Sequence, residues 1–307
     1  MKHLFIINPA AGSRNRTAQY TQQIQSVCDE KGIPYRIEIS SKAGDCSRIA
    51  REAAQTGEEY RIYSCGGDGT LNEVVSGIAG YPNVAVTMFA GGSGNDFIRV
   101  FNETAPFRDL NRLLDCKETE FDLIACNDRY CLNICSVGLD ARIGTDVANY
   151  KRIPLLNGFR AYAVSAVINT IRGVARHFVV EIDGERYDED FTMICVCNGQ
   201  YYGGGFHPVP EADPTDGRLE VLLVKKVSRL QVLSVVGKYK NGRYKELPHL
   251  VRHIRTDKLT ILCDTPSNIN LDGELLSAQK VDVRLAPSKI RFFYPKELSL
   301  QKEPLPL

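Results

Sequence analysis

Apolar and amphipathic segments alternate over the first hundred residues of the chain. Apolar runs of strand length occur at four places, residues 4–7, 34–40, 60–64 and 83–90. Segments with apolar side chains at helical spacing lie between them, at residues 17–31, 43–55 and 71–78. Strands that alternate with helices of this length are typical of parallel β/α units. The pattern therefore predicts a first domain of the α/β class.

The pattern changes near residue 120, where strand-like runs become dominant. These runs lie at residues 119–126, 130–137, 177–182, 187–197, 217–224, 259–263 and 275–285. Asp183-Gly184 separates two of them and is a typical hairpin signal. One helix-like segment is expected at residues 158–172. The pattern predicts an antiparallel β domain of two packed sheets, a β-sandwich.

The chain has 307 residues, which is about right for two domains. The β domain takes residues 126–287, and the α/β domain takes residues 1–125, to which a strand-like tail at about 288–307 is expected to return. With a net charge of +1 there is no global basic surface for nucleic acid. No apolar run reaches the roughly 18 residues of a transmembrane helix, and the N-terminal run is too short for a signal peptide. Ten cysteines without a CxxC pair are interpreted as buried thiols, so we expect a cytoplasmic protein.

Three glycine-rich loops follow strands of the first domain. They are Asn8-Pro9-Ala10-Ala11-Gly12-Ser13, Gly66-Gly67-Asp68-Gly69-Thr70 and Gly91-Gly92-Ser93-Gly94-Asn95-Asp96. Because the carboxyl ends of parallel strands lie at one edge of a sheet, these loops should converge on one crevice. Glycines let backbone N–H groups approach a ligand, and a helix N-terminus attracts anions. An ordinary strand-to-helix turn needs only one glycine, so the three loops together predict a site for phosphate.

Two later motifs follow these loops in order, Asp213-Pro214-Thr215-Asp216-Gly217 and Leu271-Asp272-Gly273-Glu274. Together the five motifs resemble the diacylglycerol kinase catalytic family, in its soluble bacterial lipid-kinase branch, which also includes sphingosine kinases. The Gly-Gly-Asp-Gly-Thr loop is shared with NAD kinases and, more loosely, with phosphofructokinases, whereas the Gly-Ser-Gly-Asn-Asp-Phe loop and the late Asp-Gly-Glu favour the lipid branch. The resemblance implies a Rossmann-like three-layer α/β domain that binds ATP, a C-terminal β-sandwich, and an active site in the cleft between them.

The resemblance and the loop positions together suggest which residues would bind ATP and metal ions. The nucleotide residues would be Asn8, Pro9, Gly12, Ser41, Gly66, Gly67, Gly69, Thr70, Asn72, Glu73, Ser93 and Asn95. No lysine of the Walker type follows the glycine-rich loop, so Mg²⁺ must neutralise more of the phosphate charge. Its candidate ligands lie at or just beyond strand ends and are Asp68, Asp96 and Asp122. The resemblance also implies a second, structural Mg²⁺ at the Asp216 carboxylate and at backbone groups of Asp213 and Arg218.

The proton acceptor for the attacking hydroxyl is expected at Asp272 or Glu274. From the residues alone, Asp-Gly between two strands is first of all a hairpin turn. The resemblance places the acceptor in this Asp-Gly-Glu motif. We favour Glu274 and keep Asp272 as the alternative, and Asp68 completes the expected catalytic set.

A basic segment lies in the second domain, where residues 225–258 carry ten Lys or Arg side chains and only two acids. A helix is expected to begin at the Ser228 cap and to carry Leu230, Leu233 and Val236 on one face. A basic amphipathic helix suits an anionic membrane surface, and a solvated basic face is the plainer alternative. We expect peripheral contact with the inner face of the membrane. A homodimer formed through the β domain is compatible with the sequence, which neither favours nor excludes it.

Three functions are consistent with these features. The first is a lipid kinase, with diacylglycerol as the leading acceptor and phosphatidylglycerol or a sphingoid base as alternatives. The second is a soluble-substrate kinase that acts on NAD. The third is a nucleotide-binding regulator without catalysis, and the presence of Asp68, Asp272 and Glu274 argues against it.

Overall fold

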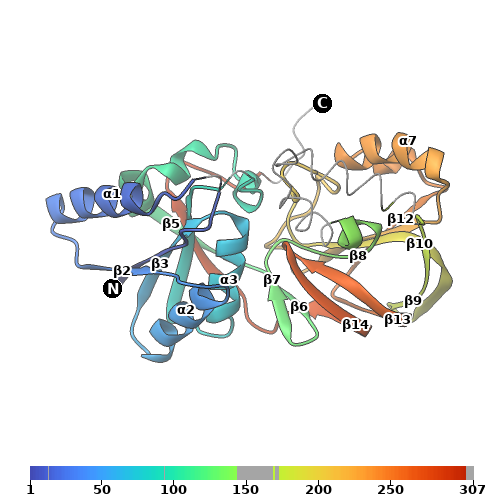
Figure 1. Ribbon diagram of the computed structural model, residues 1–307, viewed down its shortest axis with the longest axis horizontal. Coiled ribbons are helices and arrows are strands. Elements are labelled where there is room, and N and C mark those ends of the chain that lie inside the picture. Colours follow the sequence, from blue (N-terminus) through green and yellow to red (C-terminus); the bar gives the residue numbers. More distant parts are fainter. Residues whose placement is uncertain (13, 93, 144–168, 170–172, 302–307) are drawn as a thin grey trace.

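The computed structural model describes residues 1–12, 14–92, 94–143, 169 and 173–301. Two domains lie side by side, an α/β domain that contains the first part of the chain and a β-rich domain that contains most of the remainder (Figure 1). The predicted division into an α/β domain and an antiparallel β domain is confirmed. Within the described ranges, no helix is both long enough and apolar enough to cross a membrane.

The first domain is organised around a six-stranded sheet with the order β2-β1-β3-β4-β15-β5. Its strands are β1 (Lys2–Ile7), β2 (Tyr35–Ile39), β3 (Tyr60–Gly66), β4 (Val84–Ala90), β5 (Cys116–Phe121) and β15 (Ile290–Pro295). Neighbouring strands are parallel except β15 and β5, which are antiparallel. The four apolar runs of the N-terminal sequence thus form four parallel strands, and the strand nearest the C-terminus returns to this sheet.

Helices connect the parallel strands, as the helical spacing of apolar residues predicts. The longer ones are α1 (Thr17–Glu30), α2 (Asp45–Gln55) and α3 (Asp68–Ile78), and the short ones are η1 (Phe97–Val100), η2 (Ala105–Arg108) and α4 (Leu110–Leu114). Every residue of β4 is buried, which suits a strand inside a parallel sheet. Phe292 of β15 packs against Phe121 and Phe97, with ring centroids 5.4 and 5.5 Å apart. These aromatic contacts hold the returning strand in the core.

The described part of the second domain contains nine strands whose pairings are all antiparallel. They are β6 (Ile124–Cys126), β7 (Arg129–Cys131), β8 (Ile134–Gly138), β9 (Arg176–Ile182), β10 (Glu185–Cys197), β11 (Leu219–Lys225), β12 (Val251–Thr256), β13 (Lys258–Leu271) and β14 (Glu274–Leu285). The expected hairpin joins β9 and β10 at Asp183-Gly184, where both residues have positive φ. Because β9 pairs with both β10 and β13, the two expected sheets are joined into one continuous sheet whose pairings close a ring.

Helix α7 (Arg229–Lys240) begins where the sequence predicts it. The Ser228 hydroxyl and the Gln231 side chain form a reciprocal capping box. Val232 and Val235 are buried against the domain, whereas Leu230 of the predicted apolar stripe is 83% exposed and Val236 is 42% exposed. The outer face of α7 therefore presents apolar side chains to solvent. The helix expected at residues 158–172 lies outside the described residues apart from Asn169.

Candidate active site

A pocket of about 420 Å³ lies where the two domains meet. Its lining residues are Asn8, Ala10, Ala11, Gly12, Gly67, Asp68, Gly69, Thr70, Glu73, Gly92, Gly94, Asp272, Gly273 and Glu274. The three glycine-rich loops of the first domain thus converge, as the parallel-sheet rule predicts. The turn between β13 and β14 of the second domain faces them across the pocket.

Close packing of two loops explains several of the glycines. A Cβ atom on Gly92 would lie 2.6 Å from the Cα atom of Gly67, and one on Gly66 would lie 2.3 Å from the Thr70 hydroxyl oxygen. The N–H groups of Gly91 and Gly92 both donate to the Gly66 carbonyl, at 2.8 and 3.1 Å. A larger residue at Gly92 would push the two loops apart, and one at Gly66 would displace the Thr70 side chain. The glycines therefore set the shape of the pocket as well as giving a ligand access to the backbone.

The first loop is fastened to the second by Asn8. Its side-chain amide donates to the Thr70 hydroxyl at 3.1 Å, and its side-chain oxygen accepts from the Ala10 N–H at 3.0 Å. Helix α3 begins directly after Gly67, and no side chain caps its N-terminus. Its first N–H groups and the helix dipole are therefore well placed for an anion such as phosphate.

Two carboxylates, the half-buried Asp68 and the buried Asp96, lie against the same glycine. A Cβ atom on Gly94 would lie 2.9 Å from an Asp68 oxygen and 3.3 Å from an Asp96 oxygen. Asp68 accepts from the Phe97 N–H at 3.2 Å, and Asp96 accepts from the Gly204 N–H at 2.6 Å. Burial, with the neighbouring Asp96 charge as the second cause, raises the pKa of Asp68 to about 6. Burial also raises the pKa of Asp96.

This carboxylate pair fits a divalent cation. Burial and mutual repulsion make it unfavourable for both carboxylates to be ionised. A cation bound between them removes this cost. Among the described residues there is no group of three or more His, Cys, Asp or Glu side chains that could hold a metal ion. A Mg²⁺ ion at Asp68 and Asp96 would therefore take its remaining ligands from water and from phosphate, which is the usual arrangement for this ion.

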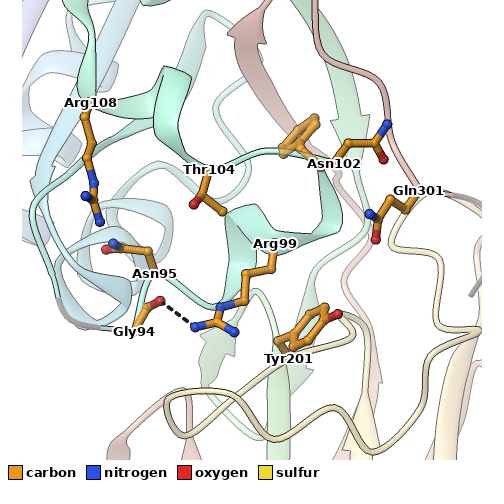
Figure 2. A pocket seen from close by; sticks show the side chains of 9 residues that line it. Gly94, Asn95, Arg99, Asn102, Thr104, Arg108, Tyr201 and Gln301 are labelled. Carbon is orange, nitrogen blue, oxygen red and sulfur yellow. Dashed lines mark hydrogen bonds between the residues drawn. The ribbon is translucent and has the colours of Figure 1, made fainter. Parts of the chain in front are cut away.

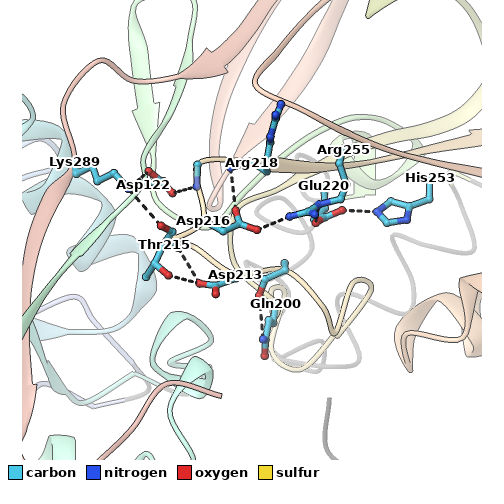
Figure 3. Close-up of polar contacts among 12 residues, drawn as sticks. Asp122, Gln200, Asp213, Thr215, Asp216, Arg218, Glu220, His253, Arg255 and Lys289 are labelled. Atoms are coloured by element: carbon cyan, nitrogen blue, oxygen red, sulfur yellow. Dashed lines mark hydrogen bonds and ion pairs between the residues drawn. The ribbon is translucent and has the colours of Figure 1, made fainter. Parts of the chain in front are cut away.

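Asp122 does not join that pair in the structure. One of its oxygens accepts from the Gly217 N–H at 2.8 Å, and the other forms an ion pair with Lys289 at 2.9 Å (Figure 3). Its backbone N–H donates to the Pro214 carbonyl at 2.7 Å. The expected grouping with Asp68 and Asp96 is therefore corrected: Asp122 fastens the loop at residues 213–218 to the first domain. The grouping failed because β5 runs antiparallel to β15 and therefore to β4, so Asp122 at its carboxyl end lies at the edge of the sheet opposite the three loops.

Asp272 and Glu274 have different environments in the turn between β13 and β14. The Asp272 carboxylate accepts the N–H groups of Leu132, Asn133 and Ile134, at 2.8, 2.9 and 2.7 Å. Asp272 also has a positive φ of 50°, so these bonds hold a turn that is uncommon for a residue with a side chain. The position of Asp272 is thereby fixed by the backbone of a neighbouring strand.

Glu274 is half-buried and lines the pocket. Burial, followed by the nearby Glu73 charge, raises its pKa, while Arg129 and the Asn72 amide act in the opposite direction. Both polar atoms of the buried Asn72 side chain lack a well-formed hydrogen bond within the described chain, although the amide is near enough to influence Glu274. A carboxylate with a raised pKa beside a phosphate site is suited to accept a proton.

The carboxylate expected at the second Mg²⁺ site is engaged by protein groups in the structure. One oxygen of Asp216 accepts from the Arg218 N–H at 2.9 Å, and the other is paired with the Arg255 guanidinium (Figure 3). Arg255 also donates to the buried carboxylate of Glu220 at 2.8 Å, and the same carboxylate contacts His253. The Arg255 guanidinium is thus the cation paired with Asp216 in the structure, and we derive no role for a second metal ion.

Replacing Arg255 by Met is expected to expose this arrangement. Loss of the guanidinium leaves the Glu220 and Asp216 carboxylates short of a cation, at a cost of about 1–3 kcal/mol in the free energy of unfolding. Thermal unfolding of the wild-type protein should not change with EDTA, whereas Mg²⁺ should partly restore the Tm of Arg255→Met. Arg218→Met removes an exposed charge from the same loop and should leave the Tm unchanged. A fall of the wild-type Tm in EDTA, reversed by Mg²⁺ and absent from Asp216→Asn, would show that a metal does bind there.

The structure places the predicted nucleotide residues in three groups. Those that line the pocket are Asn8, Gly12, Gly67, Gly69, Thr70 and Glu73, whereas Pro9, Gly66 and Asn72 belong to the same loops without lining it. Ser41 is engaged elsewhere, because its N–H and hydroxyl both donate to Asp45, at 2.9 and 2.6 Å. Asn95 lines a neighbouring pocket, and Ser93 lies outside the described residues. Reasoning from the sequence missed Arg99 and Tyr201, which line that neighbouring pocket and belong to no motif.

Family models match both domains. Residues 2–126 match the diacylglycerol kinase catalytic domain, and residues 133–294 match the YegS C-terminal NAD kinase beta sandwich-like domain. The two matches cover nearly the whole chain in the order that the fold shows. The chain therefore belongs to the diacylglycerol kinase family of lipid kinases.

Individual relatives share this two-domain layout. A protein of Staphylococcus carnosus named "Putative lipid kinase" is 27% identical over 304 residues, which cover 95% of this chain and 96% of that protein. Two solved structures from Bacillus anthracis, named as "a putative diacylglycerol kinase" and as a diacylglycerol kinase, align with TM-scores of 0.75 and 0.70. They are 21% and 19% identical to this chain, and each alignment covers 95% of this chain and 96% of the other. At this level of identity the two structures show the shared fold.

Proposed function

We propose that the chain is an ATP-dependent kinase that transfers the γ-phosphate of ATP to a lipid hydroxyl, with diacylglycerol as the leading acceptor and phosphatidic acid as its product. One observation carries the proposal: the phosphate-type loops of the first domain and the Asp272–Glu274 turn of the second domain line the same pocket. Phosphoryl transfer requires a phosphate site and a proton acceptor within the same cleft. Membership of the diacylglycerol kinase family supports the same reaction class.

Each side of the pocket has a distinct role in this proposal. The N–H groups at the start of α3 and the loop at Asn8 would bind the ATP phosphates. Asp68 and Asp96 would hold Mg²⁺, which supplies charge neutralisation at the transferred phosphate. Glu274 would accept the hydroxyl proton of the lipid, because it lines the pocket and its carboxylate, unlike that of Asp272, is not engaged by three backbone N–H groups. Asp272 would position this turn through its three bonds to backbone N–H groups.

The outer face of α7 supports contact with a membrane surface. Leu230 and Val236 are exposed there, next to a segment rich in Lys and Arg. Exposed apolar side chains beside basic ones suit the interface of an anionic bilayer. We propose that this face brings the pocket to its lipid substrate at the inner side of the membrane. More protein should sediment with vesicles when phosphatidylglycerol replaces phosphatidylcholine, and equal sedimentation would contradict this part of the proposal.

The proposed reaction is tested with radiolabelled ATP, Mg²⁺ and vesicles that contain one lipid alcohol at a time. The panel includes diacylglycerol, phosphatidylglycerol, monoacylglycerol, a sphingoid base and a polyprenol, with NAD supplied separately in solution. The expected result is labelled phosphatidic acid from diacylglycerol. Label on NAD alone, without any need for vesicles, would favour the soluble-substrate kinase. Nucleotide binding without label on any acceptor would overturn the kinase proposal.

A further inference from the structure

A second pocket of about 330 Å³ lies beside the loop that contains Gly94 (Figure 2). Its lining residues are Gly94, Asn95, Arg99, Phe101, Asn102, Thr104, Arg108, Tyr201 and Gln301. Gly94 also lines the candidate active site, so the two pockets are neighbours. Tyr201 comes from the second domain, whereas the two arginines come from the first.

The charge of this second pocket is positive. Among the described residues, its lining includes the guanidinium groups of Arg99 and Arg108 and no acidic residue. In the part of the chain that the structure describes, no carboxylate lies within ion-pair distance of Arg108. Arg99 is paired with Asp96, so the positive charge of Arg108 is the one left unbalanced, and it favours an anionic ligand.

Arg99 is held in place on the floor of the pocket. Its guanidinium lies 3.4 Å from the Asp96 carboxylate, donates to the Gly94 carbonyl at 3.4 Å and lies 5.5 Å from the centre of the Tyr201 ring. Tyr201 is itself stacked on His207, with ring centroids 3.9 Å apart and planes at 4°. A guanidinium fixed in this way loses little conformational entropy when it binds an oxyanion.

The remaining lining is suited to a polar group rather than to an acyl chain. Side-chain amides and hydroxyls come from Asn95, Asn102, Thr104, Tyr201 and Gln301. Phe101 is the one large aliphatic or aromatic hydrocarbon in the lining, and it is almost wholly buried in the core. Arginine pairs surrounded by hydrogen-bond donors are the usual protein environment of phosphate.

We propose that this second pocket is a binding site for a phosphate group, held by Arg99 and Arg108 next to the site of phosphoryl transfer. The phosphate can come from the headgroup of an anionic phospholipid or from free phosphate, and both offer the same oxygens to the two guanidinium groups. The inference concerns binding and does not require that the chain transfers phosphate. It extends the proposed function by adding an anion site on the side of the pocket that is not lined by the Asn8 loop.

Isothermal titration calorimetry of the full chain tests this inference. Inorganic phosphate and the water-soluble dihexanoylphosphatidic acid are titrated separately. Arg108→Ala should weaken the binding of both by at least about tenfold, because it removes a charge-assisted pair of hydrogen bonds. Arg51→Ala, which removes an exposed arginine from α2 in the same domain, should leave both affinities unchanged. Tyr201→Phe keeps the ring beside Arg99 and removes only the hydroxyl group, so it should weaken binding less than Arg108→Ala does.

The two ligands distinguish the source of the phosphate. Binding of the lipid at least about tenfold tighter than inorganic phosphate would identify a phospholipid headgroup, whose glycerol adds contacts with the amide side chains. Equal affinities would identify free phosphate, and both outcomes support a phosphate site. An anion held only by the glycine-rich loops would bind wild type and Arg108→Ala alike. That result, or the absence of binding by either ligand to a wild-type protein with an intact Tm, would overturn the proposal.

Discussion

Substitution of Glu274 by Gln is expected to lower kcat by about a hundred- to ten-thousand-fold, the usual contribution of a general base. Gln keeps the size of the side chain and removes its ability to accept a proton. The half-buried position of Glu274 in the pocket and its raised pKa are the structural grounds for this expectation. Steady-state assays with the preferred lipid measure the loss, and nucleotide affinity should remain within a small factor of the wild-type value because Glu274 faces the acceptor side.

Asp272→Asn provides the matched comparison in the same turn. The Asp272 carboxylate accepts three backbone N–H groups, and an Asn amide offers only one oxygen to them. We therefore expect a lower Tm for Asp272→Asn. Any fall in kcat would then result from displacement of the turn that contains Glu274. If Glu274→Gln keeps wild-type turnover while Asp272→Asn folds normally and is inactive, Asp272 is the proton acceptor and the assignment of Glu274 is wrong.

Substitution of Asp68 by Asn is expected to reduce kinase activity below detection and to stabilise the protein above neutral pH in the absence of Mg²⁺. The pKa of Asp68 is raised to about 6 from an ordinary value of 3.8, so its ionisation is unfavourable in the folded state. The protonated Asp68 is favoured in the folded state, so the stability of the protein is highest, as far as this group is concerned, below pH 4. This stability is lost as the pH rises through 6. A shift of this size corresponds to about 3 kcal/mol in the free energy of unfolding.

Denaturant unfolding at several pH values measures this effect. The stability of Asp68→Asn relative to wild type should rise between about pH 4 and pH 6 and then stay constant. Mg²⁺ should narrow the difference, because only the wild type retains both carboxylates for the ion. Asp128→Asn, in an exposed turn, makes the same change of charge and should show no such pH dependence. A variant that is less stable than wild type at pH 8 in EDTA would contradict this account of the carboxylate pair.

The sequence predicts the convergence of the three glycine-rich loops because that convergence depends on a general property of parallel sheets. It is enough to know that Ile7, Gly66 and Ala90 end neighbouring parallel strands for the following loops to be placed together. The same reasoning fails for Asp122 because β5 is not a parallel strand. It pairs antiparallel with β15, which lies more than 160 residues further along the chain, so its carboxyl end lies at the opposite edge of the sheet. Periodicity identifies a strand but contains no information on its neighbours.

The second pocket and the Asp216–Arg255 pair could not be found in the sequence for a related reason. Arg99 follows a strand of the first domain, and Tyr201 follows β10 of the second, so only the packing of the domains brings them together. Arg255 reaches Asp216 because β11 and β12 pair in the register that sets Glu220 opposite Arg255. A change of register by one residue would turn that guanidinium to the other face of the sheet.

The position of β15 also determines the order in which the chain can fold during its synthesis. β5 contacts the first sheet through β15, so the sheet that carries the phosphate-type loops cannot be completed until residue 295 has been translated. The β domain, encoded between β5 and β15, can by then have formed all its strand pairs. Nascent chains usually fold from the N-terminal domain onward. In this chain the N-terminal domain is the last to be completed, because its sheet needs β15. Until translation reaches that point, the edge of β4 is open to pairing with other chains, which makes this strand the expected starting point of aggregation when synthesis stalls.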